Sequence, residues 1–277
     1  MARHSAAESR FRVAGWVWAA LLALILVIAM VVGWFILAGR HDGGTSAQNC
    51  IDGEQQLTVW ADPAAEDVAR QLVDRYNSGG PVVRDRCVTA VVDLKSTAEA
   101  TEAYRRVEPG VAPVWIPAGT GFISGLSGAP DTVGIVATDD LVHYVPAGGN
   151  GTIGAAVLPS GPESMVSALA AEITAKDVDT GTVGEGPPLS ELRDGTRPFL
   201  TSAALFGDSA TASGELRTVG EVQFPLVAFG SSPSVDETSA RAAADFAARA
   251  DTADTVTPLP ASPWLVGVVG ALSGATL

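Results

Sequence analysis

Cys50 and Cys87 are the only two cysteines of the chain, and few kinds of chemistry suit them. A zinc site would need further ligands, but His4, His41 and His143 have no ligand spacing with either cysteine. Two free buried thiols are an alternative. Outside the cytoplasm, however, a lone pair of cysteines is most simply a disulfide. We therefore predict a Cys50–Cys87 disulfide, no metal site and no cofactor.

A hydrolase would need a nucleophile and a base. A Ser–His–acid site would have to use His143, the only histidine after His41, and no Gly-x-Ser-x-Gly elbow is present. His143 lies in the apolar stretch 141–145, which is typical of a strand, so we expect a half-buried strand residue. We therefore predict that the chain is not an enzyme.

The glycine-rich stretch 149–154 matches the dinucleotide-binding pattern by letter. That motif should open a helix, whereas this stretch soon reaches Pro159. We interpret it as a turn.

The longest uncharged run of the chain lies near its N-terminus. Residues 13–38 are apolar and exceed the ~20 residues that cross a bilayer. Three arginines precede the run, and only Arg40 and His41 follow it before an acidic region. The positive-inside rule then places residues 1–12 in the cytoplasm. We predict a plasma-membrane anchor at 13–38, a linker at 39–49 and an extracytoplasmic domain at 50–277.

The charge balance bears on partners. The chain has 17 Lys and Arg against 31 Asp and Glu, a formal net charge of −14. Nucleic acids and anionic lipids need clustered basic side chains, so this balance argues against both.

The positions of these residues follow from the elements around them. Strand patterns at 57–61, 88–94 and 111–116 alternate with helix patterns after Asp62 and after Ser96. Such alternation with short links predicts a parallel sheet. Cys50 and Cys87 then precede two strands at the same sheet edge, where a disulfide could form.

The second half of the domain is less regular. We expect two strands within 131–145, a helix after Gly161, a strand at 224–229 and a helix behind a Ser234–Glu237 capping box. The stretch 264–272 is apolar but too short to span a membrane.

Several short motifs resemble one known family. The anchor, Leu57-Thr58-Val59, the stretch 73–77, Cys87-Val88 and the stretch 114–117 are similar to the extracytoplasmic solute-binding domain of actinobacterial substrate-binding and von Willebrand factor A domain proteins. The stretch 224–227 continues the resemblance. The von Willebrand domain itself is absent from this sequence, which has no Asp-x-Ser-x-Ser site.

This resemblance implies a two-lobed α/β fold of the type 2 periplasmic-binding kind behind one transmembrane helix. Lobe 1 would comprise about 50–130 and 225–277, and lobe 2 about 131–224. Solutes in that fold lie between the lobes, near strand ends and helix N-termini. Carried onto this chain, the binding residues are Ala61, Asp62, Ala64, Ala118, Gly119 and Thr120.

The sequence departs from the family pattern at this site. Ala118 and Gly119 stand where relatives tend to carry Asp and hydroxyl residues, and Pro113 replaces a usual Asp. Asp62 would repel an anion, so the expected solute is neutral or cationic.

Two functions follow from the sequence. The first is a membrane-tethered extracytoplasmic solute-binding or sensing protein. The alternative is a structural or assembly protein of the cell envelope, with a membrane or envelope protein as partner, that uses a binding fold whose pocket has decayed. An open polar pocket between the lobes favours the first, and a filled one favours the second.

Overall fold

The computed structural model describes residue 27 and residues 50–149, 151–161, 164–174, 183–193, 195–207 and 214–274. The chain separates into two compact units, Met1–Ile51 and Asp52–Leu277, and the fold below is that of the second. The predicted cytoplasmic tail, anchor and linker lie outside the described residues, apart from Val27. Within the described part of the chain, no helix is long and apolar enough to cross a membrane.

The domain opens with the predicted strand and helix. Strand β1 (Glu54–Ala61) leads through a 3-10 turn η1 (Pro63–Ala65) into helix α3 (Glu66–Ser78). Asp62 caps the turn and Pro63 occupies its first position, where a missing N–H costs nothing. One apolar face of α3 is buried, as the amphipathic spacing of its residues predicts.

The predicted parallel sheet is confirmed. Strand β3 (Arg86–Leu94) pairs with β1 in parallel, and β4 (Val114–Ile116) pairs with the other side of β1. The short strand β2 (Val82–Val83) adds an antiparallel edge beside β3. Between β3 and β4 lies helix α4 (Thr97–Arg105), the helix predicted after Ser96. The Ser96 side chain caps it by accepting the Glu99 N–H.

Two long strands carry the sheet away from this parallel part. Strands β5 (Val133–Pro146) and β7 (Gly214–Ala228) pair antiparallel along most of their length, and the end of β7 also pairs with β4. The expectation of two strands within 131–145 was wrong. A register shift at Ile135/Ala137 and another at Leu141/Val142 absorb the irregularity, and β5 continues as one strand.

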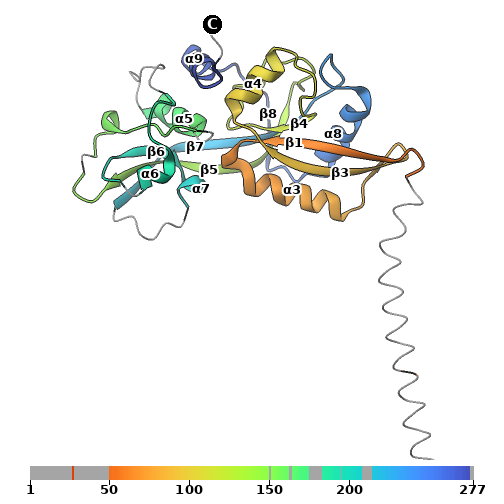
Figure 1. The fold of residues 1–277 in the computed structure, drawn as a ribbon, viewed down its shortest axis with the longest axis horizontal. Coiled ribbons are helices and arrows are strands. Elements are labelled where there is room, and N and C mark those ends of the chain that lie inside the picture. The colour runs from red at the N-terminus through yellow and green to blue at the C-terminus, as the bar shows by residue number, and fades with distance from the viewer. Residues whose placement is uncertain are drawn as a thin grey trace, which may run out of the picture. The chain divides into compact units, whose positions relative to one another are not determined.

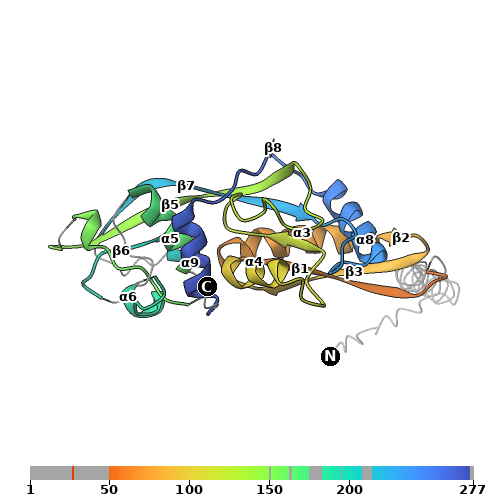
Figure 2. The same cartoon turned by 90° about the horizontal axis from the view of Figure 1, so that it is seen from above.

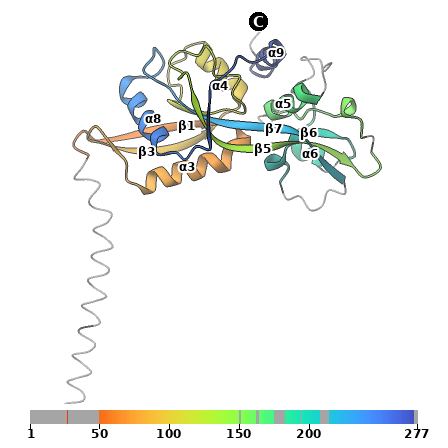
Figure 3. The ribbon, with the colours of Figure 1, turned by 180° about the vertical axis from the view of Figure 1, so that it is seen from behind.

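The elements form two groups joined by β5 and β7 (Figures 1 and 3). We call the group around β1, β3 and β4, with α3 and α4, lobe 1. Lobe 2 contains the far ends of β5 and β7. Its other elements are η2 (Ile153–Ala155), α5 (Ser164–Thr174), α6 (Leu189–Arg193), β6 (Phe199–Ser202) and α7 (Ala203–Phe206). The lobe boundaries given above stay a prediction.

The chain then returns to lobe 1. Helix α8 (Glu237–Arg249) packs on β7 and β1, strand β8 (Asp254–Val256) pairs with β5, and helix α9 (Pro263–Leu272) follows. The capping residue of α8 is Asp236, which accepts the N–H groups of Thr238 and Ser239, so the Ser234–Glu237 capping box was wrong. A carboxylate two residues later can make the same bonds as a serine hydroxyl, and the spacing rule alone does not separate them.

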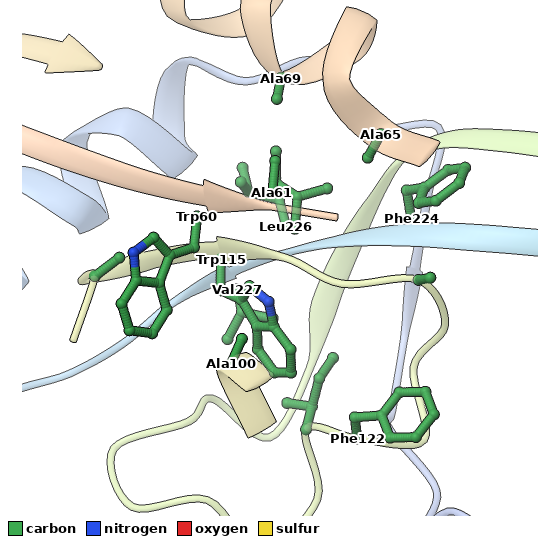
Figure 4. Packing of buried hydrophobic residues seen from close by; sticks show 14 of the residues in the cluster. Trp60, Ala61, Ala65, Ala69, Ala100, Trp115, Phe122, Phe224, Leu226 and Val227 are labelled. Carbon is green, nitrogen blue, oxygen red and sulfur yellow. The ribbon is translucent and has the colours of Figure 1, made fainter. Parts of the chain in front are cut away.

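The core of lobe 1 lies on both faces of the parallel strands. Figure 4 shows Ala65 of η1 and Ala69 of α3 on one side of β1 and Ala100 of α4, with Trp115, on the other. Trp115 is fully buried and fills the core. Small alanines on both helices allow close approach to the sheet.

Both cysteines are disulfide-bonded, and since the chain has only two, Cys50 and Cys87 are joined. Cys87 opposes Glu54 at the start of the β1–β3 ladder. The predicted disulfide is therefore confirmed.

Candidate functional site

Asp62 lies directly after β1 and is completely buried. Its carboxylate accepts the N–H of Ala64 at 3.1 Å, the N–H of Thr97 at 3.0 Å and the Thr97 hydroxyl at 2.6 Å. The Thr97 hydroxyl in turn accepts the N–H of Ala118 at 2.8 Å. One carboxylate and one hydroxyl thus tie together the loops that follow β1, β3 and β4.

The loops after β1 and β4 differ in how far their residues are exposed to solvent. Ala61 and Ala118 are fully buried and Ala64 nearly so, whereas Gly119 and Thr120 are partly exposed. Gly119 has a φ of +94°, a backbone conformation that L side chains rarely adopt. Glycine therefore lets the chain turn from the buried edge of β4 toward the surface.

Gly119 and Thr120 line a hollow of about 260 Å³, which we call the Thr120 pocket. Its other lining residues come from the segment after β4, from β5, α5 and β7, and from α9: Gly121, Phe122, Leu141, Leu169, Glu172, Ile173, Glu221, Val222, Gln223 and Leu265. Since α5 belongs to lobe 2 and the β4 loop to lobe 1, the pocket lies between the lobes, beside the strands that join them.

The charged residues that line the Thr120 pocket are both acidic. Glu172 and Glu221 contribute carboxylates, Gln223 and Thr120 contribute neutral polar groups, and no Lys or Arg is among its described lining residues. A carboxylate accepts hydrogen bonds and attracts cations. The pocket is therefore suited to a small cationic or neutral polar solute and poorly suited to an anion.

A second hollow of about 610 Å³, which we call the Ser96 pocket, also spans the two lobes. Ser96 and Glu99 line it from the start of α4, and Ser164 and Met165 line it from the start of α5. The remaining lining residues are Gly161, Val183, Gly184, Glu185, Ala271 and Leu272. Two helix N-termini thus face one space, an arrangement in which free N–H groups can meet polar ligand atoms.

The structure connects some of the predicted binding residues and separates others. Asp62 and Ala118 are brought together through Thr97, inside the protein, while Gly119 and Thr120 reach the pocket. Sequence reasoning missed Thr97, Glu172 and Glu221. Thr97 follows the second predicted strand closely enough to have been considered, but the two glutamates belong to elements whose register no local pattern reveals.

His143 on β5 is 1% exposed, more deeply buried than the half-buried residue expected from the sequence. Burial lowers its pKa from the ordinary value, and the nearby Arg217 lowers it further. Within the described ranges, no three His, Cys, Asp or Glu side chains are grouped to hold a metal ion.

No protein-family model matches the chain. Among curated proteins, it is similar to Rv1836c of Mycobacterium tuberculosis strain H37Rv and to MT1884 of strain CDC 1551, both named as uncharacterized proteins. Identity to each is 29% over 147 residues, which is 51% of this chain and 22% of the relative. The matched segment thus spans about a fifth of each relative's length.

Solved structures similar to the chain include a regulatory domain, a substrate-binding domain and an effector-binding domain. The regulatory domain of OxyR2 from Vibrio vulnificus has a TM-score of 0.43 at 14% identity, covering 70% of this chain and 95% of that one. The substrate-binding domain assigned to a molybdenum ABC transporter from Clostridium difficile has a TM-score of 0.44 at 12% identity, with coverages of 69% and 91%. The effector-binding domain of QuiR, in complex with shikimate, has a TM-score of 0.43 at 8% identity, with coverages of 71% and 96%.

Proposed function

We propose that the chain is a membrane-tethered extracytoplasmic protein that binds or senses a small solute between its two lobes. The observation that carries the proposal is the Thr120 pocket, which is bounded by lobe 1, by lobe 2 and by the strands that join them. Residues from both lobes can contact one solute there, so binding can be coupled to the angle between the lobes.

The expected solute is small and either cationic or neutral. About 260 Å³ is slightly below the ~300–1,000 Å³ typical of sites for drug-sized ligands, which favours a compact molecule. Glu172 and Glu221 would pair with its positive charge, and Thr120 and Gln223 would bind its polar groups.

The proposed tether is the uncharged stretch 13–38, and the asymmetric arginines before it set the proposed topology. We further propose that the domain binds its solute without transforming it. His143, the histidine that a Ser–His–acid site would require, is buried in β5 and is not among the residues lining the Thr120 pocket.

A second candidate is a structural or assembly protein of the cell envelope. The buried network of Asp62 and Thr97 favours it, because the Asp62 carboxylate that follows β1 is buried and bonded within the protein instead of facing a solute. The location of α9 between the lobes favours it too.

Co-purification separates the two candidates. The full chain would be purified in mild detergent from its native membrane, together with a Thr120→Phe variant whose side chain fills the pocket. Mass spectrometry would then identify small molecules and proteins released from each sample. Solute binding predicts a small cation or neutral solute that is present with the wild type and depleted with the variant. A stoichiometric protein partner with both, and no such solute, would support the scaffold.

A further inference from the structure

Helix α9 lies in the space between the two lobes. Its sequence, Pro263–Leu272, has no charged residue, and Leu265, Val268 and Val269 are buried. It packs against α4 of lobe 1 and α5 of lobe 2, and Figure 2 shows it lying between them. A single apolar helix therefore contacts both sides of the cleft at once.

The two ends of α9 line different hollows. Leu265, near its start, lines the Thr120 pocket, and Ala271 and Leu272, at its end, line the Ser96 pocket. Helix α9 thus separates two spaces that both lie between the lobes.

Two capping bonds among the described residues join α9 to the serines that flank it. Ser262 accepts the Leu265 N–H at 3.1 Å at the start, and the Ser273 hydroxyl donates to the Gly270 carbonyl at 3.3 Å at the end. These bonds travel with the helix if it moves. Before α9, the Ala261 N–H donates to the Gly121 carbonyl at 2.9 Å, and this bond must break if the helix leaves on the segment before it.

The segment that leads into α9 is suited to a tether. It contains Pro258 and Pro260 on either side of Leu259, which is 73% exposed. Prolines keep such a segment extended and stiff, and the exposed leucine indicates that it is not packed into the core.

From these observations we propose that α9 is a reversible, autoinhibitory occupant of the cleft. In place, it divides the cleft and holds α4 and α5 together. Displaced as a unit on its tether, it opens one continuous site, and a solute that needs this space competes with α9 for it. The competition rests on the proposed solute binding, whereas the displacement of α9 is measurable without any solute. A solute shifts this equilibrium only by its preference for the opened form.

Hydrogen–deuterium exchange of the full chain in detergent tests the displacement. After correction for intrinsic rates, we expect the amides of α9 to exchange ~10-fold or more faster than those of α8, because local opening exposes them without global unfolding. Val268→Ala, which removes buried contact, should speed exchange in α9 further. Val266→Ala is the matched control on the same helix, since Val266 is only partly buried.

A covalent lock provides the opposite perturbation. A Cβ built on Gly121 lies 3.3 Å from the Ala261 Cβ, close to the ~3.5–4.5 Å between the Cβ atoms of a disulfide. In the Gly121→Cys/Ala261→Cys variant, oxidation should slow exchange in α9 and leave α8 unchanged, and reduction of that bond should restore it. Peptide mapping would verify the new pairing.

Equal exchange rates in α9 and α8, with no effect of the lock, would overturn the inference, because α9 would then be a fixed part of the core. Thermal shifts with putrescine, choline and glycine on the oxidised and unlocked forms separate this outcome from a failure of the proposed function. Equal shifts in both forms would refute competition with α9 while supporting solute binding. Fast exchange in α9 without any shift would refute binding of these probes while supporting displacement.

Discussion

Replacing Asp62 by alanine tests the role of the buried network at the edge of the parallel strands. The change removes an acceptor that receives the Ala64 N–H, the Thr97 N–H and the Thr97 hydroxyl. A buried donor left without a partner costs roughly 1–3 kcal/mol, and loss of a helix cap costs ~1 kcal/mol. Because both Thr97 donors are buried, we expect the free energy of unfolding to fall by roughly 3–5 kcal/mol.

The assay is urea unfolding of the detergent-solubilised chain, followed by tryptophan fluorescence. Thermal unfolding is a second readout. For a domain of ~150–250 residues, a loss of 1 kcal/mol in the free energy of unfolding lowers the thermal midpoint by ~2–4 °C, so the midpoint should fall by roughly 10 °C. Asp67→Ala is the control, because Asp67 is exposed in the first turn of α3. It should change the free energy of unfolding by no more than ~0.5 kcal/mol.

A double-mutant cycle makes this test specific. Thr97→Val keeps the side-chain shape but removes the hydroxyl that donates to Asp62 and accepts from Ala118. Since the two residues share a buried bond, the effects of Asp62→Ala and Thr97→Val should depart from additivity by at least ~1 kcal/mol. Strict additivity, or an Asp62→Ala effect no larger than that of the control, would refute the network.

Three further predictions concern stability and topology. Burial and Arg217 lower the pKa of His143 in the folded state. The unfolded chain therefore binds a proton more readily at this residue. Stability should be lost as pH falls below the ordinary histidine pKa of ~6.5. Urea midpoints at about pH 7.5 and pH 5 should therefore differ less in His143→Gln than in the wild type, and an equal difference would contradict this reasoning. Replacing Cys50 and Cys87 by serine should destabilise the domain by ~2–4 kcal/mol, and an unchanged urea midpoint would contradict that role. Protease added to intact cells after wall removal should digest the domain and spare residues 1–12, and the reverse pattern would invert the proposed topology.

The parallel part of the fold was predictable because its signals are local. The strand–helix alternation after Leu57 and the Ser96 cap each depend on residues a few positions apart, and the structure has both. Strand β5 was mispredicted because its length depends on pairing with β7, some eighty residues later in the chain, and on two register shifts. No sequence window contains that information.

The candidate site was only partly predictable for a related reason. Position after a parallel strand was enough to single out Gly119 and Thr120, which line the Thr120 pocket. The same rule gave no sign that Asp62 turns inward, because its orientation depends on Thr97, thirty-five residues away. Glu172 on α5 and Glu221 on β7 meet Thr120 only through the tertiary arrangement of the two lobes, which no local pattern encodes.

The most direct test of solute binding is a thermal-shift comparison of the wild type with a Glu172→Gln/Glu221→Gln variant. Glu108→Gln is the control, because Glu108 is exposed and is not among the residues that line the pocket. Each protein would be screened with small organic cations, neutral polar solutes and carboxylate anions. A cation held at ~100 times its dissociation constant should stabilise the wild type and the control by ~2.7 kcal/mol. The double variant should lose most of that shift, and anions should stabilise none of the three. A flat response across the whole panel, or an equal shift in the double variant, would contradict solute binding in the Thr120 pocket.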